Sequence, residues 1–182
     1  MAVVSGAASR TPANQNYLSV IGYNLILHRA PHIEFFVQEA SIPAVSLPSV
    51  DSPNPFVKLP LSGDHIDYAQ FDVQIRVDEN LEGYLEVYNW LSGLGFPKNF
   101  EQYKALDDAD KDALRSDGKY SDIGLTMLTS LKNPNVQFTF RDAWPTSITG
   151  WEMSNVIEDV MYADCTITFA YSYFDVEVIR AT

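Results

Sequence analysis

The sequence predicts a mainly β fold: an antiparallel β-sandwich or barrel with one flanking helix and a loop-rich insertion. Residues 70–77 and 164–172 alternate apolar and polar side chains, the pattern of strands with one buried and one wet face. Between them, residues 80–92 place apolar side chains at helical spacing. With 182 residues, 46% of them apolar and 20% charged, the chain can bury one ordinary core. We therefore expect one β domain with a helix against it.

The N-terminal part of the chain divides into a polar arm and two apolar segments. Residues 1–16 are small and polar, which predicts an extended arm ahead of a single domain over residues 17–182. Residues 17–28, apolar on both faces, and residues 33–40 predict the first two strands. Prolines punctuate residues 43–60 and remove backbone donors, so we expect extended loop or sheet edge there.

The strand over residues 70–77 leads directly into the predicted helix. The inward residues of this strand are expected to be Phe71, Val73, Ile75 and Val77. Asp78 and Asn80 are candidate caps for the helix, which is expected to stop at Gly93 and Gly95. The predicted packing face of the helix consists of Leu81, Tyr84, Leu85, Tyr88 and Leu91.

The C-terminal half contains an insertion and the remaining strands. Residues 93–120 form the most polar internal stretch and predict a surface insertion, with a short helix near residues 107–116. Strand patterns resume at residues 123–131 and 136–140 and end on the second long alternating segment. The apolar phase of that segment shifts by one residue near Tyr173, which predicts a bulge or a bend.

Charge and cysteine content restrict the class of protein. Asp and Glu number 24 against 12 Lys and Arg, a formal charge of −12, so phosphate backbones and anionic lipid should be repelled. The single cysteine, Cys165, predicts no internal disulfide. No run approaches the roughly 20 apolar residues of a spanning helix, and the first residues lack the pattern of a secretion signal. These features predict a protein of the cytoplasm, or of an assembly made there, without membrane contact.

No residue pattern predicts catalysis, a metal or a cofactor. The acidic run at residues 107–112 fails as a calcium loop, because aligning Gly118 with the loop glycine puts Ala113 where an Asp is required. The histidines lack zinc-site spacing: His28, His32 and His65. Phosphate-loop and nucleophile-elbow motifs are absent from the sequence. Carboxylate pairs arise by chance in so acidic a chain, so a hydrolase is the weakest alternative.

Residues 142–179 carry charge of one sign only. They hold no Lys, Arg or His, and their carboxylates are Asp142, Glu152, Glu158, Asp159, Asp164, Asp175 and Glu177. Two interpretations stay open at this point. The stretch is either an ordinary solvated face or a surface that repels polyanions, as a channel that passes DNA without binding it would need.

Three segments, taken in order, resemble one family. Residues 75–91 form a strand ending in Val-Asp-Glu that runs into a helix closing on Trp90, residues 142–152 contain a Trp-Pro turn, and residues 164–177 form a long alternating strand. They resemble the tail tube superfamily of contractile-tailed, T-even-like bacteriophages, and above all the tube terminator at the head-proximal end of the tail. The insertion at residues 93–120 departs from the family pattern.

The resemblance implies a structural virion protein, not an enzyme, with no cofactor or metal. Six copies would join their sheets into a ring-shaped β-barrel around a DNA channel, with other tail tube, sheath or neck proteins as partners. Genomic DNA would pass without specific binding, and the protein would reside in the virion tail after assembly in the host cytoplasm. The lumen-facing residues would be Asp72, Gln74, Asp164 and Thr166. The support helix and packing anchors would be Tyr84, Tyr88, Trp90 and Trp144.

Alternatives remain both within this family and outside it. Within it, the chain could be the major tail tube protein or the baseplate protein that starts the tube. Outside it, a soluble carbohydrate-binding β-sandwich would stack sugar rings on exposed Trp144 and Trp151. The oligomeric state separates these classes, because a tube protein assembles whereas a lectin-like module can be monomeric.

Overall fold

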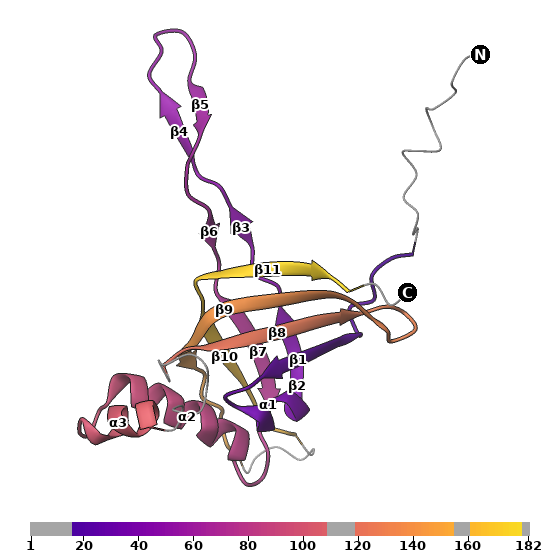
Figure 1. The fold of residues 1–182 in the computed structure, drawn as a ribbon, viewed down its shortest axis with the longest axis vertical. Coiled ribbons are helices and arrows are strands. Elements are labelled where there is room, and N and C mark those ends of the chain that lie inside the picture. Colours follow the sequence, from indigo (N-terminus) through magenta and orange to yellow (C-terminus); the bar gives the residue numbers. More distant parts are fainter. Residues whose placement is uncertain (1–15, 109–118, 155–160, 180–182) are drawn as a thin grey trace.

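The computed structural model describes residues 16–108, 119–154 and 161–179, so the predicted arm over residues 1–16 lies, apart from Asn16, outside the described residues. The elements in chain order are β1 (Tyr23–Leu27), α1 (Pro31–Phe36), β2 (Val37–Ser41), β3 (Val45–Ser46), β4 (Ser49–Ser52), β5 (Leu59–Ser62), β6 (Asp67–Tyr68), β7 (Phe71–Arg76), α2 (Glu82–Gly95), α3 (Glu101–Asp108), β8 (Ser121–Leu128), β9 (Pro134–Ile148), β10 (Asp164–Ala170) and β11 (Tyr173–Val178). Strands dominate this order, which confirms the predicted mainly β class (Figure 1).

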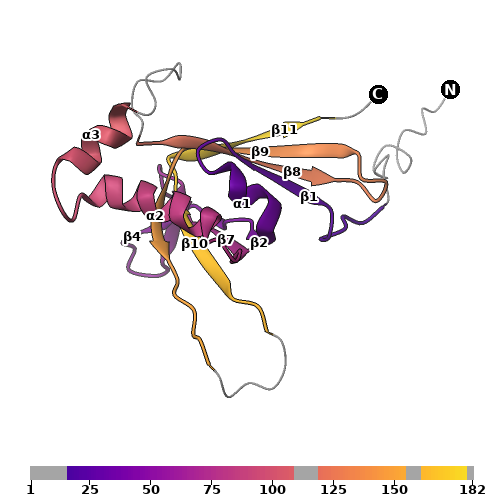
Figure 2. The ribbon, with the colours of Figure 1, turned by 90° about the horizontal axis from the view of Figure 1, so that it is seen from below.

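Two antiparallel sheets share strand β9. Sheet A contains, side by side, β1, β8, the first part of β9 and β11. Sheet B contains the last part of β9, then β10, β7 and β2. Figures 1 and 2 show the two sheets diverging from β9, with α1 and α2 beside the angle between them. The described strands of one chain do not close into a barrel, so a closed barrel would need further copies.

The corner between the sheets lies at a bulge in β9. Asp142 has a φ of 52°, in the left-handed region, and the register with β8 shifts at this point. The Arg141 guanidinium holds the corner: Nη1 donates to Asp122 on β8 at 2.6 Å and Nε donates to Asp175 on β11 at 3.2 Å. The hydrogen bond to Asp122, and then that to Asp175, raises the pKa of Arg141. Both carboxylates therefore share a permanent cation.

The chain bends a second time between β10 and β11, beside the first corner. Strand β10 ends at Ala170 and β11 begins at Tyr173, with the Ser172 N–H donating to the Arg141 carbonyl at 3.0 Å. β10 and β11 thus run along β9 as one bent partner. The bend predicted near Tyr173 from the change of apolar phase is confirmed.

The core fills the angle between the two sheets. Most of the inward residues predicted for the long alternating strands are buried: Phe71, Val73 and Ile75 from β7, and Cys165, Ile167 and Phe169 from β10. Val77, also predicted to point inward, follows the end of β7 and is partly buried against the core. Phe71 stacks on Phe140 of β9 with ring centroids 4.3 Å apart and so joins the sheets. Each large apolar side chain buried in this way stabilises the fold by roughly 1.5–3 kcal/mol.

Helix α2 begins where the sequence predicts but packs through a different face. Leu81, and neither of the expected caps Asp78 and Asn80, holds the N-cap position. The Asp78 carboxylate still accepts from the backbone N–H groups of Glu82 and Gly83, at 2.9 and 3.4 Å, and so satisfies donors of the first turn. The buried residues are Gly83, Val87, Trp90 and Gly93. The predicted face was therefore wrong, and Leu85 and Tyr88 are 45% and 47% exposed. Apolar residues occur on more than one side of α2, and Gly83 lies against Ile33 of α1.

The predicted N-terminal strands are shorter than expected. β1 covers only Tyr23–Leu27 at the edge of sheet A, so a strand over residues 17–28 covered on both sides was wrong. Tyr17, Val20 and Ile21 are exposed. Residues 33–40 divide into α1 and β2, since Pro31 opens a short helix at the position where proline's missing N–H costs nothing.

The later elements follow the predicted order with different limits. Helix α3 occupies Glu101–Asp108 within the predicted insertion, and the helix expected near residues 107–116 falls mostly outside the described residues. The strand expected at 136–140 is the middle of the much longer β9. A Pro within β9 and the bulge beside it hide this continuity from a pattern of strict alternation.

The proline-rich connection forms a hairpin that projects from the body (Figure 1). A short ladder of β3 with β6 forms its base, and β4 with β5 forms its outer part. This confirms an extended conformation for residues 43–60. The hairpin leaves large apolar side chains in solvent, including Phe56 at 91% exposure at its tip.

Candidate functional site

Sheet B presents a polar face on the side away from the core. In the ladder of β7 with β10, Gln74 lies opposite Thr166 and Asp72 lies opposite Thr168. These side chains are half-buried and alternate with the buried residues of the same strands. The structure therefore brings together the residues that the sequence predicts to face a lumen, since Asp164 lies on the same face at the end of β10.

The flanking strands of sheet B continue this polar surface. On β2, Glu39 is in register with Gln74 and Ser41 with Asp72, and both are exposed. On the last part of β9, exposed Ser147 lies opposite Thr168. By register the face carries three carboxylates, on Glu39, Asp72 and Asp164, against one guanidinium, on Arg76. The surface is thus largely polar, with Ala170 on the same face at the end of β10, and acidic on balance.

Asp164 is an ion-paired carboxylate on this face. Arg76 Nε donates to Asp164 Oδ1 at 3.1 Å, and the two side chains are 41% and 33% exposed. The Arg76 guanidinium also lies 5.2 Å from the ring centroid of Tyr162. Sequence reasoning missed Arg76 as part of the site, because only the register of β7 with β10 shows that residues so far apart in the chain are neighbours. Asp72 has no ion-pair partner among the described residues.

The aromatic residues predicted as packing anchors all make ring contacts. Trp90 is buried, and its indole N–H donates to the Lys119 carbonyl at 2.9 Å. Tyr84 stacks with Tyr88 at 6.2 Å and meets Trp151 edge-on at 5.0 Å. These contacts tie helix α2 to the segment that follows β9.

Trp144 and Trp151 occupy packed positions. Trp144 is half-buried and meets Tyr120 edge-on at 5.3 Å, while Trp151 is half-buried against Tyr84. Both rings pack against the core cluster. Neither ring is presented as the open platform that stacking on a sugar requires, so the geometry gives no support to a carbohydrate site.

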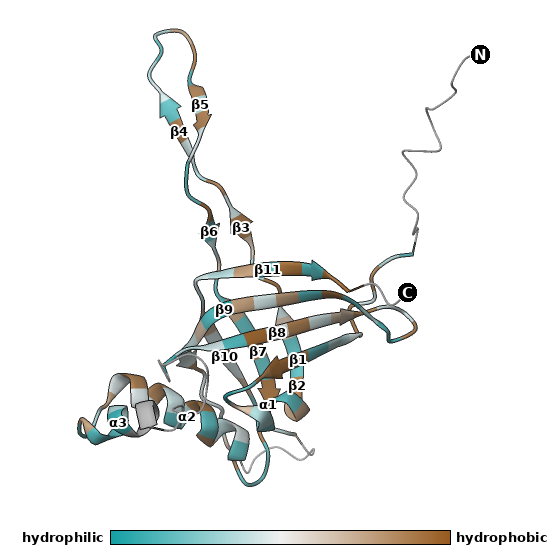
Figure 3. Ribbon diagram, viewed as in Figure 1, coloured by the Kyte–Doolittle hydropathy of each residue, from teal (hydrophilic) through white to brown (hydrophobic). Residues whose placement is uncertain are grey.

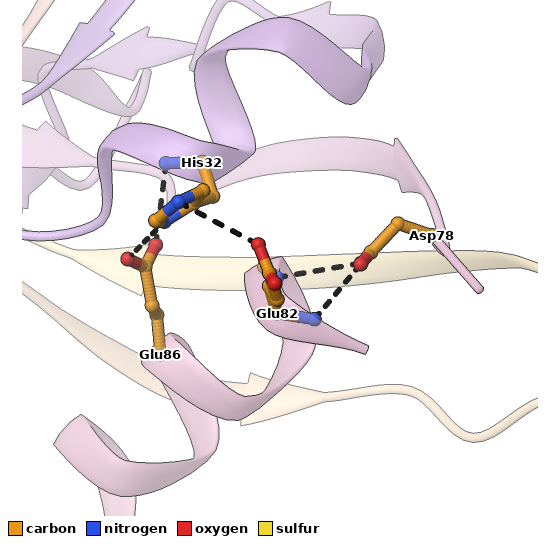
Figure 4. A network of polar contacts seen from close by, with 5 residues as sticks. His32, Asp78, Glu82 and Glu86 are labelled. Carbon is orange, nitrogen blue, oxygen red and sulfur yellow. Dashed lines mark hydrogen bonds and ion pairs between the residues drawn. The ribbon is translucent and has the colours of Figure 1, made fainter. Parts of the chain in front are cut away.

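A charged network ties α1 to α2 (Figure 4). His32 Nδ1 lies 2.5 Å from Glu86 Oε1, His32 Nε2 lies 3.6 Å from Glu82 Oε2, and the His32 N–H donates to Glu86. The hydrogen bond to Glu86 raises the pKa of His32. No group of His, Cys, Asp or Glu within the described ranges has the arrangement of a metal site, so we assign this network to packing of the two helices.

The buried titratable groups have raised pKa values that make them inert near neutral pH. Burial, and secondarily Asp164, raises the pKa of the Cys165 thiol to about 11, which keeps it protonated and unreactive. Burial raises the pKa of Tyr171 to about 12, and its hydroxyl donates to the Ala69 carbonyl at 2.8 Å. No helix in the described part of the chain is both long and apolar enough to cross a membrane.

Comparison with solved structures identifies relatives of this architecture. The tube terminating cap in the anti-feeding prophage cap structure aligns with a TM-score of 0.60 at 13% identity, over 95% of this chain and 99% of that chain. The sheath/tube terminator of the PVC extracellular contractile injection system in its extended state aligns with a TM-score of 0.59 at 12% identity, over 91% and 99%. The sheath-tube complex of that system gives a TM-score of 0.53 at 11% identity, over 91% and 94%. At these identities the likeness establishes the fold.

Comparison by sequence gives the family. No curated protein matches this chain. A family model described as phage tail tube protein matches residues 10–177, which includes both sheets, the hairpin and the helices. The fold, the order of the elements and this match agree, and the chain belongs to the phage tail tube protein family.

Proposed function

We propose that this protein is a structural virion subunit that forms a ring of a contractile tail, and specifically the tube terminator at its head-proximal end. The observation that carries the proposal is sheet B, whose outer face is largely polar and which has a free edge on each side. Among the described strands, β2 and the last part of β9 each have a neighbour in sheet B on one side only. Such a sheet is built to continue into copies of itself.

Ring closure uses these two edges. An exposed sheet edge recruits further strands, and a closed ring of identical subunits leaves no edge unpaired. Joining β2 of one copy to the last part of β9 of the next would make the sheets of all copies into one barrel wall. In a hexamer the summed formal charge is 6 × −12 = −72, so the copies must be held together by backbone pairing and apolar contact.

The polar face of sheet B lines the lumen in this arrangement, with the core and helices outside it. Asp72, Gln74 and Thr166 would face passing DNA, together with the Arg76–Asp164 pair. An acidic wall repels phosphate, so genomic DNA passes without being held. The work of the protein is then mechanical and electrostatic, and no catalytic step or cofactor is required.

The terminator is favoured over the tube subunit by two features. The chains described as a tube terminating cap and a tube terminator align over 99% of their own lengths, with TM-scores above that of the sheath-tube complex. The segment around α3 adds surface beyond the sheets, which suits contact with neck and sheath proteins. We place the protein in the virion tail, assembled in the host cytoplasm, with residues 17–182 as one domain and residues 1–16 as an arm held by neighbours.

The mass of the purified protein, measured by light scattering together with negative-stain imaging, tests this proposal. The chain is expected to form rings, either alone or when tail tube protein is added as a template. Assemblies that stop at one ring identify a terminator, whereas assemblies that grow into tubes identify a tube subunit. A monomer that ignores tail proteins would overturn the proposal and favour a soluble binding module.

A further inference from the structure

The junction of α2 and α3 carries aromatic rings that solvent reaches. Phe96, Phe100 and Tyr103 contact one another with ring centroids 5.5 to 6.1 Å apart. Phe96 and Phe100 are nevertheless 44% and 70% exposed. No charged residue occurs in residues 87–97, which lead along α2 to these rings. A surface helix ordinarily turns charged side chains to solvent, so we expect this end of α2 to be covered in the assembled protein. We call the three rings the aromatic cluster.

The aromatic cluster lies past one edge of sheet B. Figure 2 shows α2 crossing the strands of this sheet and continuing beyond the last part of β9 to α3, while β2 lies at the opposite edge. In the ring proposed above, the β9 edge of one copy joins β2 of the next copy. Joined strands lie about 4.8 Å apart, so the end of α2 reaches across the joint toward the elements that flank β2 in the next copy.

An open groove lies beside β2, between this strand and β1. It has a volume of about 410 Å³, and its apolar walls are Val20, Ile21 and Val37. Val20 and Ile21 are each 87% exposed, so both side chains can gain a contact. Glu34 and Gln38 add polar groups to the lining. Figure 3 shows hydrophobic and hydrophilic colour interspersed here, on β1 and α1, and also on α2 and α3. The groove therefore suits an aromatic side chain that enters beside a cation.

We propose that the aromatic cluster of one copy binds in the groove between β1 and β2 of the next copy. This inference rests on the proposed function, because the joint of β9 with β2 is what brings the two surfaces together. The cluster and the groove lie on opposite sides of one chain (Figure 2), so no copy fills its own groove and the contact repeats in one direction around a closed ring. The contact buries apolar side chains behind the joint, where strand pairing alone supplies only backbone hydrogen bonds.

The charges at the two surfaces favour a second copy of the chain as the occupant. Copies with a formal charge of −12 repel one another wherever their acidic surfaces meet. Lys98 and Lys104 flank the aromatic cluster, with Glu101 as the carboxylate between them, and neither lysine forms an ion pair with a described residue. The groove contains Glu34, whose carboxylate accepts from the Leu27 N–H at 2.6 Å. Docking therefore brings lysines toward a carboxylate, where most contacts between copies would bring two carboxylates together.

Cysteine cross-linking in mixed assemblies tests the contact. One copy carries Phe100→Cys and a second carries Ile21→Cys, and a short thiol-reactive cross-linker is added after assembly. The wild-type thiol Cys165 is buried and stays unreactive, so the native chain provides the blank. Glu79→Cys is the matched control for the aromatic cluster, because this exposed residue precedes the other end of α2. Glu177→Cys is the matched control for the groove, because β11 and β1 are opposite edges of sheet A.

A charged substitution provides a second, independent measurement. Phe100→Asp should raise the protein concentration needed for ring formation by at least about tenfold, because it removes an aromatic anchor and places a carboxylate near Glu34. Leu131→Asp, at a position that is 83% exposed, is the control and should leave this concentration unchanged. Both positions are exposed, so neither variant is expected to alter the urea midpoint of the isolated chain. Equal concentrations for the two variants would overturn the docking.

A cross-linked dimer is expected from Phe100→Cys with Ile21→Cys, and this product is expected to be lost with either control. Rings without this product, or equal yields with the controls, would overturn the docking and leave the ring itself standing. A cross-link from Phe100→Cys to a different tail protein would also overturn it. Absence of both rings and cross-links, with tail proteins present, would count against the docking and the proposed function together.

Discussion

Sheets A and B follow the same alternation but differ in how much of the apolar side the chain itself covers. In sheet B the inward side chains of β7 and β10 are at most 2% exposed. In sheet A the exposure rises along the strands, from 0% at Phe140 to 60% at Val178. The comparison teaches that apolar alternation identifies a face that must be covered, but does not identify which molecule covers it.

The largest expected effect tests the covered side of sheet B. Phe71→Ala removes a ring that stacks on Phe140 and lies against Phe169, so it should lower the free energy of unfolding by about 3–5 kcal/mol. Urea unfolding of the isolated chain measures this. Val178→Ala on the exposed end of sheet A is the control and should change stability by no more than about 0.5 kcal/mol. Similar losses of unfolding free energy in the two variants would mean that one chain covers the apolar faces of both sheets.

The next effect concerns the corner where the two sheets meet. Arg141→Leu leaves Asp122 and Asp175 without their shared cation. It should lower the free energy of unfolding by about 1–2 kcal/mol, a value between the contribution of a hydrogen bond to a charged group and that of an exposed ion pair. The same unfolding measurement with Arg76→Leu provides the comparison. That substitution breaks the more exposed pair with Asp164 and should cost about 0–1 kcal/mol. The reverse order would show that the corner does not depend on Arg141.

A functional difference is expected between the polar faces of the two sheets. Asp72→Lys, Gln74→Lys and Thr166→Lys combined should leave ring assembly intact and slow DNA ejection, because cations in a lumen bind passing phosphates. Asp164 is left unchanged in this variant to preserve its pair with Arg76. The control is Gln137→Lys with Thr139→Lys on the polar face of sheet A, which should not alter ejection. The measurement is the rate of DNA ejection from assembled particles. An unaltered rate in the sheet B variant would show that this face does not line the channel.

The smallest expected effect is on pH dependence at the α1–α2 contact. The partners of His32 raise its pKa in the folded state. The protonated ring therefore contributes its full stabilisation at pH values below the pKa that His32 has in the unfolded chain. This contribution is lost as the pH rises through the raised folded value. His32→Gln should therefore lower the melting temperature at pH 5 and approach the wild-type value well above neutral pH. A difference independent of pH would show that His32 acts by packing alone, and Glu86→Gln should reproduce the loss at low pH.

The sequence predicts those parts of the fold in which local pattern and tertiary packing agree. β7 and β10 alternate without interruption, so their alternation, most of their inward residues and the bend after β10 are confirmed, although both strands are two residues shorter than predicted. The polar face follows from the same alternation, which is why Asp72, Gln74, Asp164 and Thr166 lie together. Their role in a lumen stays a prediction, since it depends on other copies.

The features that the sequence did not predict depend on distant neighbours. The packing face of α2 includes Gly83, which lies against Ile33 of α1, and Gly93, and a count of apolar residues gives glycine no weight. The exposed segment from Tyr17 to Ile21 reads as a buried strand, because sequence alone does not show where a sheet ends. The pair of Arg76 with Asp164 requires the register of two strands far apart in the chain. The left-handed Asp142 at the corner has no sequence signal of its own.

Strand β9 also determines how a load would pass through the subunit. Because one continuous backbone belongs to both sheets, a pull on the outer end of sheet A travels along covalent bonds into sheet B. The two sheets cannot slide past each other without breaking the ladders on both sides of β9. In a ring of such subunits, tension on the outer end of sheet A would load the corner, where the hydrogen bonds of Arg141 to Asp122 and Asp175 oppose separation of the strands.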